Sequence, residues 1–179
     1  MPKYPDLTEQ LSGHEGLEFE AYPDPLSPLY AACKEAGVSP YRGGYKAVPG
    51  WQRIDASPWT IGRGHNLEAH PDPAYPAAPG TTCTLEQADA WLESDIAEAE
   101  ASMLHRWPWM SALPRSVYLA LLNMVFNMGA ARFSGFQETL YHLKRHEYAL
   151  AADELVDSLW FRQVGSRARR IVAQVRKGE

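Results

Sequence analysis

Two carboxylates near the start of the chain have the residue types and the spacing that acid–base chemistry needs. Glu15 lies where a short helix is predicted to end, just before Gly16, and eight residues separate it from Asp24. A partly buried carboxyl keeps its proton and can protonate a glycosidic oxygen, whereas an ionised carboxylate in a more solvated loop can orient water. Glu15 is the better candidate for the acid and Asp24 for the anion. This pair is the minimum machinery of glycoside hydrolysis.

A second stretch, Trp59–His65, combines β-branched residues with Gly62 and Gly64. Glycines in a strand let another backbone or a ligand approach closely. We therefore expect this strand to lie beside the two carboxylates.

The N-terminal half predicts one helix, a long ordered loop and a small sheet. Hydrophobic spacing predicts a helix over residues 5–19. Residues 21–58 are rich in proline, glycine and aromatic side chains, which predicts an ordered loop with one short helix at 29–36. Residues 59–67 are expected to form a strand, and the proline-rich stretch 68–83 a connector.

The C-terminal half predicts helices. Thr84 and Gln87 fit a capping box that opens a long helix, expected to join two lobes. Pro114 starts another helix, whose residues 117–126 are apolar almost all round and so predict burial, and Gly129 marks its end. Further helices are predicted at 137–145, 147–158 and 167–177. The fold class is therefore α+β, with a small sheet lobe and a larger helical lobe.

Charge and composition exclude several classes of protein. The net charge of −5 argues against nucleic acid as the main partner. Residues 1–131 hold 8 basic and 16 acidic groups, whereas residues 132–179 hold 9 basic and 6 acidic groups. The basic C-terminal part either steers an acidic polymer such as a bacterial cell wall or is a solvated helix face. No apolar run approaches the roughly 20 residues that a membrane span requires.

Two pairs of side chains could in principle bind a metal, but the sequence does not favour a metal site at either pair. Cys33 and Cys83 lack the spacing of a metal site, and we expect free thiols. His142 and His146 stand four positions apart, as metal ligands on a helix do, but no HExxH motif and no third ligand accompany them. We expect an exposed helix here, with no metal or cofactor.

Five motifs, in this order along the chain, together resemble one known family. The set resembles the bacteriophage lysozymes, the muramidases of glycoside hydrolase family 24. The motifs are His14-Glu-Gly-Leu17, Tyr22-Pro-Asp24, Thr60-Ile-Gly-Arg-Gly-His65, Asn123-Met-Val-Phe-Asn-Met-Gly129, and Trp160 with Arg167-Ala-Arg-Arg170.

The resemblance implies an inverting N-acetylmuramidase that hydrolyses the β-1,4 bond between N-acetylmuramic acid and N-acetylglucosamine in peptidoglycan. It implies a catalytic set of Glu15, Asp24 and Thr60, with Thr60 holding the water. It also implies one phage-lysozyme-like domain over residues 1–179, with an N-terminal helix at 1–19, a β lobe at 20–83 and the inter-lobe helix and helical lobe at 84–179. Predicted substrate contacts are Gly62, Phe126, Asn127, Trp160 and Arg167, of which Arg167 takes the place of an arginine that pairs with the catalytic glutamate.

The chain departs from the family between the second and third catalytic positions. The family has about five residues there, whereas 35 separate Asp24 from Thr60. Asp55 stands five positions before Thr60, so it competes with Asp24 for the same role. For the insertion, residues 25–57, we expect a loop at the cleft edge that contacts glycan through Tyr41, Tyr45 or Trp51.

Two other functions stay open at this point. One is a non-catalytic peptidoglycan-binding or assembly protein on a lysozyme scaffold, and the other is a lytic transglycosylase. The N-terminus has no apolar core of a signal peptide. We therefore expect a protein made in a host cytoplasm that reaches the wall by an external release route. We also expect it to be a monomer. Lysis, virion entry and bacterial competition all fit.

Overall fold

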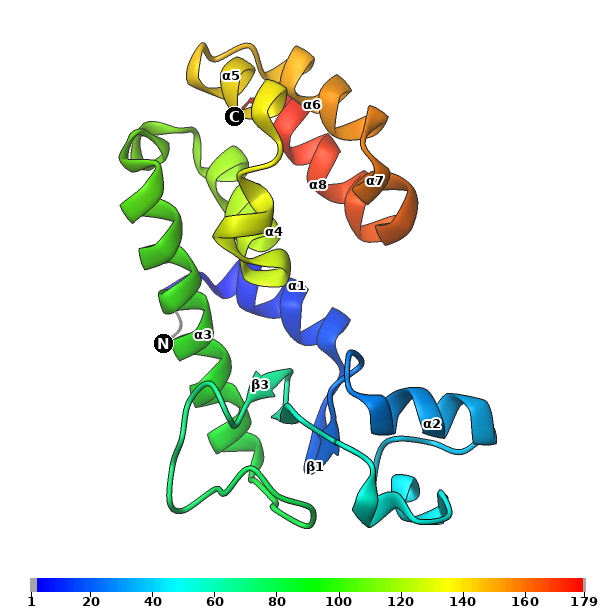
Figure 1. Ribbon diagram of the computed structural model, residues 1–179. Coiled ribbons are helices and arrows are strands. Elements are labelled where there is room, and N and C mark those ends of the chain that lie inside the picture. The colour runs from blue at the N-terminus through cyan, green and yellow to red at the C-terminus, as the bar shows by residue number, and fades with distance from the viewer. Residues whose placement is uncertain (1–2, 179) are drawn as a thin grey trace. The chain divides into compact units, whose positions relative to one another are not determined.

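The structure is a computed structural model that describes residues 3–178, except for the side chains of His14 and Glu15. The chain divides into two compact units, Met1–Ser94 (unit 1) and Asp95–Glu179 (unit 2). Helix α3 (Leu85–Arg106) runs through the boundary (Figure 1). The predicted long helix is therefore confirmed, and the Thr84 hydroxyl accepts a hydrogen bond from the Gln87 amide at 3.1 Å, as a helix cap does. A single lysozyme-like domain stays a prediction.

Unit 1 carries the sheet. Among the described residues its strands form one antiparallel sheet in the order β1-β2-β3. Hydrophobic spacing extends the predicted helix too far, to residue 19, whereas the end predicted at Gly16 is confirmed: Gly16 adopts φ +69° and the chain turns into a strand two residues later. The elements are α1 (Pro5–Glu15), β1 (Glu18–Pro23), α2 (Pro28–Ala36), the 3₁₀ turns η1 (Gly44–Ala47) and η2 (Trp51–Arg53), β2 (Trp59–Gly62) and β3 (His65–Asn66).

The insertion builds part of the core of unit 1. Helix α2 confirms the predicted helix, and its first turn is capped by Ser27, whose hydroxyl accepts the Tyr30 amide at 3.2 Å. Leu29, Cys33 and Tyr45 are fully buried and pack with residues of β2 and α3. The expectation that Tyr45 contacts glycan is therefore wrong, because its ring is inside the protein.

The stretch predicted as one strand over 59–67 is two strands joined by a tight turn. Gly62 and Gly64 both have positive φ, which lets the chain reverse between β2 and β3. The connector 68–83 forms isolated bridges, and one of these pairs Thr82 with Glu20. Strand β1 is thus paired on both sides, with β2 on one edge and the end of the connector on the other.

Unit 2 is helical, and α4 is its most buried element. Its residues 119–125 are all buried, as the apolar run predicts. Gly129 breaks the helix at φ +77°, after which a last turn continues to Phe133. The elements after α3 are η3 (Pro108–Ala112), α4 (Arg115–Phe133), α5 (Gln137–Lys144), α6 (Tyr148–Asp157), α7 (Leu159–Val164) and α8 (Ser166–Lys177). The α+β class is confirmed, whereas α7 was not predicted.

The basic end of the chain forms an amphipathic helix. Helix α8 packs against α4 and α6 through an apolar stripe that includes Ile171 and Val175. Arg169 and Arg170 are exposed, and Arg176 pairs with Asp153 at 2.6 Å. Of the helices in the described residues, none combines the length and apolar character needed to cross a membrane.

The cysteines and histidines singled out in the sequence have structural surroundings. Cys33 and Cys83 are free thiols, as predicted, and burial raises the pKa of both. His142 Nδ1 lies 2.8 Å from a carboxylate oxygen of Glu147. His146 has φ +59° and lies beyond α5 rather than on it. Residues 3–178, apart from the two undescribed side chains, contain no group of three metal-ligating side chains.

The burial of the insertion predicts its contribution to stability. Leu29→Ala is expected to lower the free energy of unfolding by about 2 to 5 kcal/mol, because it leaves a cavity in the core. Leu26→Ala, three residues earlier and 91% exposed, is the matched control and should change it by less than about 0.5 kcal/mol. Urea unfolding followed by circular dichroism measures both. Equal stability of the two variants would mean that the insertion is an appendage to the core.

Candidate active site

The β1–β2 ladder brings Asp24 and Thr60 together. In the register of the two strands, Tyr22 faces Thr60 and Pro23 faces Trp59, so Asp24 directly follows the last paired residue. The Thr60 hydroxyl donates to Asp24 Oδ2 at 3.3 Å. Thr60 is buried and Asp24 is half-buried. Two residues that are 36 positions apart in sequence therefore share one hydrogen bond.

Further hydrogen bonds fix the orientation of Asp24. Its amide donates to the Pro58 carbonyl at 2.9 Å, which extends the ladder by one step. Its Oδ1 accepts the Leu26 amide at 2.8 Å, and its carbonyl accepts the Ser27 amide at 2.8 Å. The insertion therefore leaves and rejoins the sheet at neighbouring points. Its length does not separate the two strand ends.

Asp55, the competing residue, has other contacts. Its Oδ1 accepts the Ser57 amide at 2.9 Å, and its carbonyl accepts the Leu29 amide at 2.9 Å. The side chain is exposed and forms a local turn of the kind that aspartates favour. The structure thus pairs Thr60 with Asp24, whereas Asp55 stabilises the turn through which the insertion leads back to β2.

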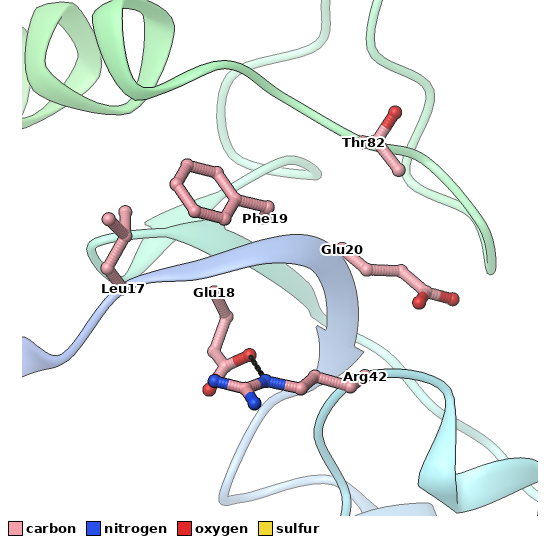
Figure 2. A pocket seen from close by; sticks show the side chains of 6 residues that line it. All are labelled: Leu17, Glu18, Phe19, Glu20, Arg42 and Thr82. Carbon is pink, nitrogen blue, oxygen red and sulfur yellow. Dashed lines mark ion pairs between the residues drawn. The ribbon is translucent and has the colours of Figure 1, made fainter.

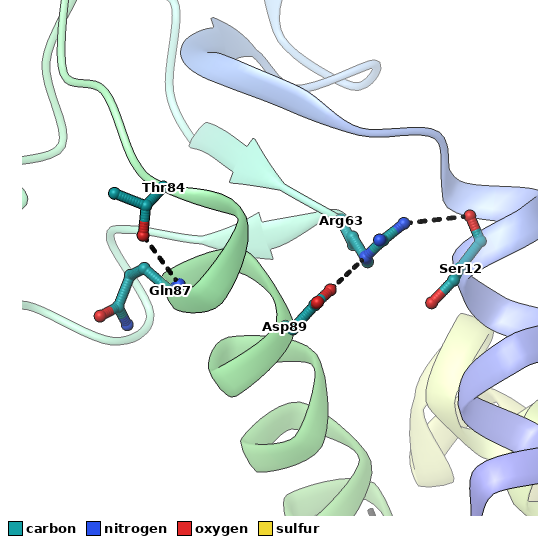
Figure 3. Close-up of polar contacts among 5 residues, drawn as sticks. All are labelled: Ser12, Arg63, Thr84, Gln87 and Asp89. Carbon is teal, nitrogen blue, oxygen red and sulfur yellow. Dashed lines mark hydrogen bonds and ion pairs between the residues drawn. The ribbon is translucent and has the colours of Figure 1, made fainter.

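Glu15 is the last residue of α1, but its side chain lies outside the described part of the structure. The helix itself is tied to the sheet by Arg63, in the turn between β2 and β3 (Figure 3). Arg63 Nε donates to Asp89 Oδ1 at 2.8 Å, and its Nη1 donates to the Ser12 carbonyl at 3.3 Å. Ser12 precedes Glu15 by three residues. Arg63 therefore links α1, the hairpin and α3 next to the candidate acid.

Sequence reasoning missed the role of Arg63. Its side chain is only 15% exposed, so its charge-assisted hydrogen bonds are poorly screened by water. The signal available was a charged residue between two glycines in a tight turn. No spacing rule connects that position to Ser12 or Asp89, because the contact depends on how the helices pack.

Gly62 has a packing reason for being glycine. It has φ +65°, and a Cβ at this position would lie 3.1 Å from the Ala88 Cβ. The strand therefore approaches α3 closely only because this side chain is absent. Its predicted contact with substrate stays a prediction.

A hollow of about 300 Å³ opens along β1, beginning two residues after Glu15 (Figure 2). Its acidic side chains form ion pairs with cations of the insertion. Arg42 Nε lies 3.5 Å from Glu18 Oε2, and Lys46 Nζ lies 3.1 Å from Glu20 Oε1. The cation of each pair is exposed to water, which screens the charges, so each pair adds little stability. They place the insertion beside the start of β1. The lining residues are Leu17, Glu18, Phe19, Glu20, Arg42 and Thr82.

Unit 2 brings two of the predicted substrate contacts together. Arg167 Nη1 donates to Asn127 Oδ1 at 2.6 Å, and Asn127 Nδ2 donates to the Asn123 carbonyl at 2.7 Å. Phe126 is half-buried on α4. Trp160, on α7, is also half-buried and packs edge-on against Phe136 with ring centroids 6.1 Å apart. The contacts of all four with substrate stay predictions.

Comparison with known proteins identifies the family. The phage lysozyme family matches residues 43–178. The chain belongs to the phage lysozyme family. The match includes Thr60, Gly62 and the predicted contacts in unit 2, but it begins after Glu15 and Asp24. For those two positions the relation to the family rests on the sequence motifs alone.

The individual relatives of the chain are distant. It is 27% identical over 99 residues to a probable T4-type lysozyme 1 of Dictyostelium discoideum, covering 53% of this chain and 58% of that protein. It is 28% identical over 132 residues to the peptidoglycan hydrolase gp36 of Pseudomonas phage phiKMV, covering 73% of this chain and 14% of that protein. It is 30% identical over 98 residues to the pre-baseplate central spike protein Gp5 of Enterobacteria phage T4, covering 53% of this chain and 17% of that protein. The chain thus spans less than two thirds of each relative.

The link made by Arg63 can be tested by a double-mutant cycle. Arg63→Met is expected to lower the free energy of unfolding by about 1.5 to 3 kcal/mol, because it removes hydrogen bonds to a charged group. Asp89→Asn should cost less, and the double variant should be little worse than Arg63→Met alone. Arg53→Met, an exposed arginine in the same unit, is the control. If the two losses simply add in urea unfolding, the Arg63–Asp89 contact does not stabilise unit 1.

Proposed function

We propose that the chain is an N-acetylmuramidase, which hydrolyses the β-1,4 bond between N-acetylmuramic acid and N-acetylglucosamine in bacterial peptidoglycan. The observation that carries the proposal is the hydrogen bond from Thr60 to Asp24 at the end of the β1–β2 ladder. Membership of the phage lysozyme family and the similarity to a phage peptidoglycan hydrolase support it.

Glu15 is the proposed general acid. A glycosidic oxygen leaves readily only when it is protonated as the bond to the anomeric carbon breaks. Glu15 closes α1, and Arg63 fixes the preceding turn of that helix through Ser12. The helix can therefore hold the acid at one position while the sugar distorts toward its transition state.

Asp24 and Thr60 are proposed to position the attacking water. The Thr60 hydroxyl donates its hydrogen bond to Asp24 Oδ2, so its oxygen lone pairs can accept a hydrogen bond from water. Asp24 can accept the other water proton as the oxygen attacks the anomeric carbon. Attack from the face opposite the leaving group inverts the configuration, which requires room for water between the two carboxyls.

Residues of unit 2 are proposed to bind the glycan. The Asn127 amide is held between Asn123 and Arg167, so its orientation is fixed before substrate arrives. Phe126 and Trp160 offer half-buried ring surface, which suits the apolar faces of sugars.

The choice between the two aspartates gives a direct prediction. Asp24→Asn is expected to lower kcat by roughly 10² to 10⁴, because the variant cannot accept the proton of the water. The decrease in kcat for Asp55→Asn should be at least ten times smaller. Initial rates of reducing-end release from a soluble glycan fragment, with thermal unfolding as the check on folding, compare them. If Asp55→Asn is the inactive variant and Asp24→Asn is active, the assignment is reversed.

The role of the acid and the class of reaction can be read from one set of digests. Glu15→Gln should abolish the clearing of purified peptidoglycan, and Glu9→Gln, on an exposed position of the same helix, should not. Mass spectrometry of the wild-type digest should find reducing ends, and early NMR spectra should show the α anomer. Products with 1,6-anhydro ends would identify a lytic transglycosylase. Wall binding without released sugar would identify a non-catalytic binding protein.

A further inference from the structure

The insertion creates a second hollow, of about 400 Å³, beside the start of β2. Its walls come from η2, from the residues that lead into β2, and from Pro79 of the connector. Trp59 and Thr60 are consecutive in β2, so their side chains point to opposite faces of the sheet. Because Trp59 lines the hollow and Thr60 bonds Asp24, a ligand in the hollow would not occupy the candidate active site.

The aromatic walls of this hollow are held rigidly. Trp51 is half-buried and packs edge-on against Tyr45, with ring centroids 5.3 Å apart. Tyr45 is fully buried and packs in the same way against Trp59, at 5.4 Å. A ring that is fixed by its neighbours loses little freedom when a ligand binds to it. The hollow is therefore formed before any ligand arrives.

Polar groups accompany the aromatic rings. Asp55 uses one carboxylate oxygen to accept the Ser57 amide, and a carboxylate has further lone pairs that can accept hydroxyl hydrogens. The Ser57 hydroxyl is itself held by Glu68, at 2.6 Å, and Gln52 adds an exposed amide. Rings beside a few fixed hydrogen-bonding groups are the usual composition of a small-ligand site.

The charge of the lining restricts the ligand. None of the described residues that line this hollow is a lysine, arginine or histidine, whereas one is an aspartate. An anionic group, such as the lactyl carboxyl of N-acetylmuramic acid or the carboxyls of a stem peptide, would be repelled by Asp55. A neutral sugar with an apolar ring face and a hydroxyl edge fits both the rings and the carboxylate.

We propose that this hollow binds an N-acetylglucosamine unit of the glycan strand, as a second glycan contact outside the active site. The proposal rests on the proposed function for the identity of the polymer. A second contact on the same polymer raises the effective concentration of the first, so it should strengthen retention on walls more than turnover of short fragments.

The test uses the whole chain of residues 1–179 with Asp24→Asn, and the trimer of N-acetylglucosamine is the probe. Titration followed by NMR should shift the indole N–H signals of Trp51 and Trp59. Trp51→Ala in the same background should weaken binding by roughly threefold to tenfold, the range expected for the loss of one aromatic stacking contact. Tyr141→Ala removes an exposed aromatic of α5 and is the matched control, with no change expected.

The outcomes separate this proposal from the proposed function. Shifts confined to residues around Thr60, with both tryptophan signals unmoved, would overturn the second site and leave hydrolysis standing. Unchanged affinity of a folded Trp51→Ala variant would overturn it as well. If the tryptophan signals shift but the wild-type protein releases no reducing ends, the second site is supported and the muramidase function is contradicted. A Trp51→Ala variant that does not fold leaves the indole titration of the parent protein to decide.

Discussion

The pairing of β1 with β2 is the constraint on which the candidate site depends. The ladder places Tyr22 opposite Thr60 and ends with the Asp24 amide bonded to the Pro58 carbonyl at 2.9 Å. Because this pairing holds the end of β1 beside Thr60, the carboxylate and the hydroxyl meet although 35 residues separate them in sequence. Any length of insertion is compatible with this site, provided that its two ends return to the same rung.

The insertion adds both buried core residues and exposed surface to unit 1. Its helix α2 and its buried tyrosine, Tyr45, pack with β2 and α3, so it folds as part of the unit rather than as a mobile loop. Closing a longer loop costs only slowly increasing entropy, and the apolar burial at Leu29 and Cys33 offsets it. The outward sides of the same segment carry the ion pairs to β1 and the aromatic hollow beside Trp51.

Much of this architecture could be predicted from the sequence, because local signals agree with the fold. The apolar run in α4, the cap at Thr84 and the break at Gly129 each act through neighbouring residues, and each was predicted. The end of α1 was extended too far because residues 17–19 are as compatible with a helix as with a strand, and pairing with β2 decides between them. The choice of Asp24 over Asp55 and the link from Arg63 to Ser12 depend on register and packing, which no local pattern encodes.

The central claim is that Asp24 and Thr60 act as one unit on the attacking water. A double-mutant cycle on kcat measures this most directly, with Asp24→Asn, Thr60→Val and the combined variant assayed on one soluble glycan fragment. The account predicts strong non-additivity, with the combined variant no slower than Asp24→Asn alone within about twofold. Losses that multiply independently would show that the hydrogen bond between the two residues plays no part in the reaction.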